Sequence, residues 1–309
     1  MKILVLGSGA DGGIPLWNCS CSACHDCRAA RPPKLMPQPQ RTQSSVAVSQ
    51  DGLTWVLLNV SPDINQQIRA NRLLQPQRSA EGSANAPSHR PLHKSLDTAL
   101  STPIKALVLL DAQWQSVGGL LNLRDSAGLE VFATPLMFED MTEALAQRHV
   151  MESRCSVHWH LLPVAGTETQ AEFRIPGFGD LRFVAIALPG TLPDAVQGGV
   201  PDPLQPGGGS VGQSIALAVE DLGSGLMFVY APQLPHSPQL TEAELAWLQD
   251  TACLLMDGSA ELPLRGFAGR RILTHLSHNN PLLDERSAAR QRIEAEGIEL
   301  AFDGMVIDL

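Results

Sequence analysis

The sequence lacks an excess of basic residues and any long hydrophobic run, and each absence excludes a class of function. Its 22 lysines and arginines against 32 aspartates and glutamates give a formal net charge of −10. Non-specific nucleic-acid binding needs a basic face, so we expect no nucleic-acid partner. No apolar stretch reaches the roughly 20 residues that span a membrane, and the N-terminal apolar run ends at Gly7, too early for a signal peptide. We therefore expect no membrane span and a cytoplasmic location.

Four of the six cysteines fall between Cys19 and Cys27. In a reducing compartment such a cluster favours metal binding over disulfides, although a set of reduced thiols without metal is the alternative. Thiolates with the spacing C-x-C-x2-C can converge on one ion from a tight loop, and tetrahedral zinc fits sulfur ligands best. The first three ligands would be Cys19, Cys21 and Cys24. The spacing leaves three candidates for the fourth ligand: Cys27, His25 and the distant His278.

Strand and helix patterns alternate along the chain and predict two β-sheets packed back to back, with helices outside. The predicted strands are 2–6, 41–49, 53–60, 104–110, 129–134, 157–162, 181–188, 214–220, 225–231, 253–256, 271–274, 298–302 and 305–309. The predicted helices are 64–71, 118–124, 135–150, 241–250 and 284–296. Ser61 is the expected N-cap of the first helix, with Pro62 at its first position. Thr241 and Glu244 predict a capping box for the fourth helix.

Glycines follow the first predicted strand, which suggests a dinucleotide-binding loop. Pro15, Trp17 and the cysteines come directly afterwards and leave no room for the helix that would hold a pyrophosphate, so we reject this interpretation. Residues 76–102 are polar and predict a flexible insertion, and the proline- and glycine-rich residues 189–209 predict a long loop.

Polar residues follow the ends of several buried strands: Asp111 and Gln113, then Asp257, then His275. Sheets in α/β proteins bind ligands at such ends, so we predict a polar site along one edge. His158 and His160 share one face of a predicted edge strand. They could pair on a metal, but we favour solvent-facing positions.

Short motifs along nearly the whole chain resemble the PqqB family of pyrroloquinoline quinone (PQQ) biosynthesis, a branch of the metallo-β-lactamase fold. The motifs are Val5-Leu6-Gly7-Ser8 with Gly12-Gly13, Trp17-Asn18-Cys19-x-Cys21, Arg41-Thr42-Gln43-Ser44-Ser45, Ser61-Pro62-Asp63-Ile64, Leu110-Asp111-Ala112-Gln113, Tyr230-Ala231-Pro232, Asp257-Gly258, Asn280-Pro281-x-Leu283-Asp284-Glu285 and Phe302-Asp303-Gly304-Met305. The resemblance implies a single αββα metallo-β-lactamase sandwich over residues 1–309, an α/β fold of two mixed sheets with helices on both outer faces. It also implies metal-dependent oxidation of a tyrosine-derived precursor, or transport of PQQ or that precursor.

A related branch, the PhnP phosphodiesterases, is similar at two points: the C-x-C-x2-C segment and a late His-x-x-His. Carried over, these imply a structural zinc held by Cys19, Cys21, Cys24 and His278, while His275 faces the active site. PqqB proteins usually have asparagine at the position of His278, so at this position the chain is more similar to PhnP.

The chain departs from both families at the main metal motif. The fold usually has His-x-His-x-Asp-His and PqqB has Asp-x-Gln-x-Asp-His, whereas this chain has Asp111-x-Gln113-x-Gln115-Ser116. Glutamine and serine hold divalent metals poorly. Asp111, Gln113, Asp257 and His275 remain as candidate catalytic ligands of a second metal, iron or another, or else as leftover polar residues.

Three functions therefore stay open. The chain is a PqqB-like protein with an altered metal shell and PQQ or its precursor as ligand, a PhnP-like phosphodiesterase, or a non-catalytic paralogue that keeps the zinc loop. We expect catalytic activity to be weak or absent. The sequence leaves the oligomeric state open, with a homodimer as one option.

Overall fold

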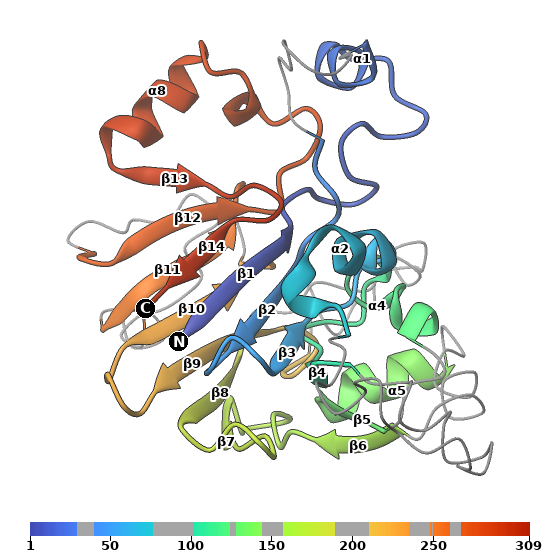
Figure 1. Ribbon diagram of the computed structural model, residues 1–309, viewed down its shortest axis with the longest axis vertical. Helices are drawn as coiled ribbons and strands as arrows, with labels where there is room; N and C mark the ends of the chain where they lie inside the picture. Colours follow the sequence, from blue (N-terminus) through green and yellow to red (C-terminus); the bar gives the residue numbers. More distant parts are fainter. Residues whose placement is uncertain are drawn as a thin grey trace, which may run out of the picture.

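The first β-sheet contains both ends of the chain (Figure 1). The computed structural model describes residues 1–29, 40–76, 102–123, 128–143, 157–188, 210–234, 248, 250–259 and 267–309. In spatial order the sheet has strands β14 (Val306–Asp308), β1 (Lys2–Gly7), β2 (Ser45–Ser49), β3 (Trp55–Leu58), β4 (Ile104–Val108), β5 (Leu129–Ala133) and β6 (Val157–Leu161). Strands β14 to β3 pair antiparallel and β3 to β6 pair parallel, so the sheet is mixed.

The second sheet is also mixed. Its strands, in spatial order, are β13 (Ile298–Leu300), β12 (Arg270–Thr274), β11 (Thr251–Asp257), β10 (Met227–Ala231), β9 (Ile215–Asp221), β8 (Leu181–Ala187) and β7 (Gln170–Phe173). Strands β13 to β10 pair parallel, and β10 to β7 pair antiparallel. The parallel halves of both sheets place several strand ends, and the polar residues that follow them, where ligands bind in such folds.

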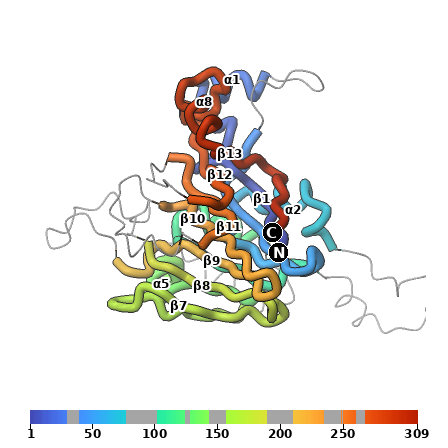
Figure 2. The backbone as a smooth tube through the Cα atoms, turned by 90° about the vertical axis from the view of Figure 1, so that its left-hand side faces the viewer, coloured from blue at the N-terminus to red at the C-terminus, as the bar shows by residue number. Residues whose placement is uncertain are grey.

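The helices cover the outer faces of the sandwich. They are α1 (Ser22–Ala29), α2 (Ile64–Ala70), α4 (Trp114–Val117), α5 (Pro135–Glu143) and α8 (Ala288–Ala295), with 3-10 turns η1 (Arg72–Leu74), η3 (Leu120–Leu123) and η5 (Pro281–Leu283). Helices α2, α4 and α5 lie beside the first sheet, and α8 packs beside β13 (Figure 1). Both views place α1 and α8 at the same end of the molecule (Figure 2). No helix in the described ranges is long and apolar enough to cross a membrane.

Alternation along the strands divides the apolar residues between two cores. On β10, Phe228 and Tyr230 belong to the large core between the sheets, whereas Val229 and Ala231 belong to a smaller core on the outer face. This follows from the two-residue period of a β-strand. Ile293 of α8 packs on the outer core, so that helix covers the second sheet.

Two local predictions are wrong. Ser61 does not cap α2: its hydroxyl donates to Gln67 Oε1 (3.2 Å), and Asp63 occupies the cap position. The helix expected at 118–124 is instead α4, starting at Trp114, followed by η3. Between them the backbone of Gly119 lies so close to Ser61 that a Cβ would meet its carbonyl oxygen at 2.0 Å.

The boundaries of other elements also differ between the prediction and the structure. The last helix is shorter than expected, because the Ser287 hydroxyl accepts from the Arg290 amide (3.0 Å) and starts α8 there. Strand β7 was not predicted, since its sequence QAEF is half polar. The helix expected at 135–150 is described as far as Glu143. The expected insertion and long loop, apart from residues 76 and 102, and the capping box of Thr241 and Glu244 lie outside the described residues.

The carboxylate of Asp303 connects the segment that runs from the second sheet to the first with residues near the start of the chain. Asp303 lies between β13 and β14, and its Oδ1 accepts from the amide and hydroxyl of Ser8 (2.9 and 2.8 Å). Its Oδ2 accepts from the amide and hydroxyl of Thr42 (2.6 and 2.7 Å). The buried Arg41 guanidinium donates to the same Ser8 hydroxyl (2.7 Å) and to the carbonyl of Ala301. The glycine-rich turn after β1 is therefore held by this carboxylate.

We expect Asp303→Ala to lower the free energy of unfolding by about 2–4 kcal/mol, because it leaves four donors without their acceptor and removes a negative charge that stabilises the buried Arg41 guanidinium. Urea denaturation measures this. The control is Asp308→Ala, which removes the exposed ion pair with Lys2 (2.7 Å) and should cost less than about 1 kcal/mol. Equal losses in the two variants would contradict the role assigned to Asp303.

Candidate metal centre and rim site

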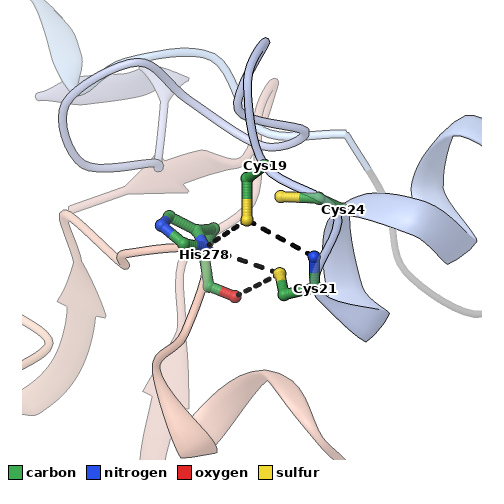
Figure 3. A group of neighbouring side chains, drawn as sticks. All are labelled: Cys19, Cys21, Cys24 and His278. Carbon is green, nitrogen blue, oxygen red and sulfur yellow. Dashed lines mark hydrogen bonds between the residues drawn. The ribbon is translucent and has the colours of Figure 1, made fainter.

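Three cysteines and a distant histidine converge beside α1. Cys19 and Cys21 lie in the loop before the helix, Cys24 lies on it, and His278 follows β12. Their ligand atoms all lie within 4.8 Å of one another, and the side chains point inward (Figure 3). The sulfurs of Cys19 and Cys21 are each 3.5 Å from His278 Nδ1. Tetrahedral zinc with Zn–S near 2.3 Å and Zn–N near 2.0 Å would separate sulfur and nitrogen by about 3.5 Å. The geometry therefore suits that ion.

Of the three candidates for the fourth position, the structure brings only His278 to these cysteines. His25 is 72% exposed and contacts Asp26 through Nδ1 (3.2 Å). The Cys27 thiol points to the carbonyl of Ile14 and belongs to the outer core. In the described part of the chain, Cys19, Cys21, Cys24 and His278 are the only histidine, cysteine or acidic residues whose ligand atoms gather this closely in a group of three or more.

Backbone amides and an arginine shape the cysteine loop. The Leu16 amide donates to Cys24 Sγ (3.3 Å) and the Cys21 amide to Cys19 Sγ (3.4 Å). Arg28, one turn further along α1, donates to the carbonyls of Cys19 and Leu16. Arg28 was not predicted from the sequence. The feature that could have indicated it is a basic residue in the last turn of the helix that carries Cys24. The loop is thus held in a shape that points its sulfurs at His278.

The thiols differ in acidity. A hydrogen bond from the Cys24 backbone, and then one from His278, lowers the pKa of Cys21 to about 6. Burial, together with the neighbouring sulfurs, raises the pKa of Cys24 to about 11, although the hydrogen bond from the Leu16 amide lowers it. Three thiolates this close repel one another unless a cation lies among them, and a bound divalent ion supplies that charge. The cluster is therefore suited to a metal and would release protons on binding it.

The backbone of Leu276 fixes the segment between His275 and His278. Its amide donates to the Ser8 carbonyl and its carbonyl accepts from the Ala10 amide, both at 3.0 Å. His275 precedes it with a φ of 56°, a left-handed conformation that is uncommon for a residue other than glycine. This turn directs the two histidines to different sites.

The four predicted rim residues follow strands of both sheets. Asp111 and Gln113 follow β4, Asp257 ends β11 and His275 follows β12. A backbone bridge joins Asp111 to Ser214, directly before β9, so the two sheets meet here. The strand ends agree with the predicted edge, and the grouping of all four residues in one site stays a prediction. We define this edge, with Asp111, Gln113, Asp257 and His275, as the rim site.

Hydrogen bonds within the protein already engage much of the rim site. Asp111 accepts from the Gln113 amide and the Ser116 hydroxyl, both at 2.9 Å. Gln113 Oε1 accepts from Gln115 Nε2 (2.5 Å) and from Gln233. Asp257 accepts from the amide of Ser259 (2.7 Å) and from its hydroxyl. Gln115 and Ser116, which stand where the family motif has Asp-His, thus serve as hydrogen-bond donors at this edge, so the role of the rim residues as metal ligands stays a prediction.

His158 and His160 face solvent on the edge strand β6, as expected, with exposures of 65% and 42%. Both rings hydrogen-bond to the Glu130 carboxylate, and His158 Nδ1 lies 2.9 Å from it. These bonds lower the pKa of Glu130. Each imidazole therefore has a carboxylate as a neighbour.

The chain is similar in sequence to a known domain family and to known proteins. Residues 54–296 match the family model described as the beta-lactamase superfamily domain. Coenzyme PQQ synthesis protein B of Pseudomonas paraeruginosa is 35% identical over 345 aligned residues, covering 100% of both chains. The protein of the same name from Methylobacillus flagellatus is 34% identical over 339 residues, again with full coverage.

Two solved structures also have a similar fold. The Zn²⁺-bound PqqB from Methylobacterium extorquens has a TM-score of 0.73 at 26% identity and covers 100% of both chains. A diphosphatase of the PhnP family has a TM-score of 0.60 at 17% identity, covering 99% of this chain and 97% of its own. At that identity the second likeness shows the fold alone.

We expect Cys21→Ser to lower zinc content and thermal stability together, because a structural metal contributes its binding free energy to folding. The thermal midpoint should fall by about 5 °C or more. Mass spectrometry of the metal content and thermal unfolding of the same preparation measure both effects.

The matched control is Cys27→Ser, a buried thiol on the same helix whose sulfur lies outside the cluster. It should keep its zinc. A Cys21→Ser protein with unchanged zinc content and unchanged thermal stability would contradict the assignment of a structural zinc to these cysteines.

Proposed function

The chain belongs to the coenzyme PQQ synthesis protein B family within the β-lactamase superfamily, and we propose that it acts in PQQ biosynthesis by binding PQQ or its tyrosine-derived precursor at the rim site. The expected αββα sandwich of two mixed sheets is confirmed. The proposal therefore concerns the ligand and the chemistry, and the fold is its starting point.

The observation that carries the proposal is likeness over the whole length. Identity of 35% extends over 100% of this chain and of the relative, so the likeness includes the N-terminal cysteine segment as well as the 54–296 domain. A match to the domain alone would support only the fold, because one fold serves many chemistries.

The rim site offers donors that suit a quinone. Carbonyl oxygens of a quinone accept hydrogen bonds, and the amides of Gln115 and Gln233 lie at this edge. Both sheets contribute to the site, so a ligand bound there would contact residues distant in the sequence. A protein that carries PQQ or its precursor must bind this molecule without converting it quickly.

We assign a structural zinc to the cysteine centre. Four protein ligands close the tetrahedron, and closed sites of this kind stabilise the fold, whereas catalytic zinc sites keep one position for water or substrate. The reduced thiols also fit a cytoplasmic location.

A second metal at the rim site would be held by Asp111, Gln113, Asp257 and His275, where it would polarise a bound oxygen. The protein's own donors already occupy oxygens of the first three residues. An amide oxygen is also a weak ligand in place of an imidazole. We therefore propose that this metal is bound weakly and that binding of the organic ligand is the main role of the rim site.

The family proposal is tested in cells. In a PQQ-producing bacterium from which the gene for the B protein has been deleted, expression of this chain should restore PQQ in the medium, measured by mass spectrometry. The Cys27→Ser variant should restore it equally. Restoration by neither protein, with both chains present at normal levels, would contradict a role in this pathway.

Metal content tests the proposal for the rim site. We expect about one zinc per chain and less than one equivalent of any second metal in freshly purified, tag-free protein, measured with iron and manganese included. His275→Ala should leave the zinc in place, and His158→Ala, on the exposed edge strand, serves as control. A full equivalent of a second metal that disappears only in His275→Ala would show that the rim site is a true metal centre.

A further inference from the structure

Two motifs that lie far apart in the sequence, Asp257-Gly258 and Asn280-Pro281, are joined by a hydrogen bond in the structure. The Asn280 side chain donates from Nδ2 to the carbonyl of Gly258 (3.3 Å). Its Oδ1 accepts from the amide of Leu282 (2.9 Å) and caps the 3-10 turn η5. The oxygen of this amide therefore starts a helical turn, and its nitrogen holds the residue that follows Asp257 of the rim site.

The side chain of Leu276 packs closely on the same glycine. A Cβ added at Gly258 would lie 2.3 Å from Leu276 Cδ2 and 3.0 Å from the carbonyl oxygen of Thr274. Leu276 is fully buried, so it has little room to make way for a larger residue. The Gly258 amide also donates to the Thr274 carbonyl (2.6 Å). Residues of the segment 274–280 therefore hold the turn after β11 at three points.

This segment also carries the two histidines of the candidate sites. His275 belongs to the rim site, and His278 is the candidate fourth ligand of the zinc. His278 lies between Leu276 and Asn280, both of which contact Gly258. The turn after β11 is thus fastened to the part of the chain that the cysteine centre holds.

The direction of the Asp257 carboxylate depends on the same turn. Its Oδ1 accepts from the amide of Ser259 (2.7 Å) and from the Ser259 hydroxyl. Gly258 is the residue between them, so a shift of its backbone would move Ser259 and turn the carboxylate. The hydrogen bond from Asn280 therefore acts on Asp257 through the backbone of Gly258.

We propose that Asn280 is a positioning residue of the rim site, which holds the Asp257 carboxylate in place through Gly258. Because His275 belongs to the same segment as Asn280, the two rim residues of the second sheet keep a fixed relation to each other. A site that is ordered before its ligand arrives loses less conformational entropy on binding. Naming that ligand as PQQ or its precursor rests on the proposed function above.

Asn280→Ser separates the two hydrogen bonds of this side chain. Serine caps helices about as well as asparagine, so the bond from the Leu282 amide is kept, whereas its shorter side chain does not reach the Gly258 carbonyl. Hydrogen exchange of the Gly258 and Ser259 amides, measured by NMR on the zinc-loaded protein, should become about two- to tenfold faster, the effect of one lost hydrogen bond. The zinc content should stay the same.

The affinity for PQQ, measured by titration calorimetry on the same preparation of Asn280→Ser, should fall by about two- to fivefold, because Asp257 is no longer held in position. Asn280→Asp, a second variant of nearly the same shape, keeps the acceptor and lacks the donor. It should change the exchange rates and the affinity in the same direction.

The matched control is Asn279→Ser, the same substitution one position earlier. Asn279 is exposed, and its side chain accepts from the hydroxyl of Ser277 (2.7 Å). Exchange at Gly258 and Ser259 and the affinity for PQQ should therefore equal those of the wild type.

The outcomes separate this proposal from the proposed function. Unchanged exchange at Gly258 and Ser259 in Asn280→Ser overturns the positioning role, and so does faster exchange spread evenly over both sheets, which would indicate a general loss of stability. An unchanged PQQ affinity in that variant, with PQQ bound by the wild type, overturns it as well. Absence of PQQ binding by the wild-type protein contradicts the proposed ligand instead, and the exchange rates, measured without ligand, still decide the role of Asn280.

Discussion

Both candidate sites depend on the backbone hydrogen bonds of Leu276. Ser8 and Ala10, at the end of the first strand of one sheet, hold this residue just after the last long strand of the other sheet. Because Leu276 is fixed, His275 and His278 on either side are directed to two places, the rim site and the cysteine centre. A displacement of this short segment would move both histidines together. The glycine-rich loop after β1 therefore has a structural role.

The two sites contrast in how their ligand atoms are used. At the cysteine centre, amides and Arg28 orient the loop, and the sulfurs and His278 point at one position. At the rim site, Ser116, Gln115 and Ser259 donate to the oxygens that a metal would use. The first arrangement presents ligand atoms to an ion, and the second satisfies them within the protein. A chain that keeps its zinc for stability while its rim site binds an organic ligand is consistent with this contrast.

Sequence reasoning predicted most of the sheets because nearly all of the long strands are apolar and buried, as on β4 and β11. It missed β7, where Glu172 and Gln170 break the apolar pattern, and it assigned Ser61 to a cap although Gln67 takes its hydroxyl. The spacing of the cysteines predicted a metal but left its fourth ligand open, since the approach of His278 depends on the Leu276 segment. The resemblance to PhnP pointed to His278, and local spacing alone did not.

The chemistry of the rim site is the hardest feature to read from sequence. The motif with Asp111 and Gln113 was visible, but the hydrogen bonds that engage their oxygens emerge only in the folded structure. With glutamine and serine in place of the Asp-His pair, the edge has lost a charged metal ligand and an imidazole and gained neutral hydrogen-bonding groups. Neutral hydrogen-bonding groups of this kind are poor ligands for a cation, and this chemistry supports the proposal that the rim site binds an organic molecule.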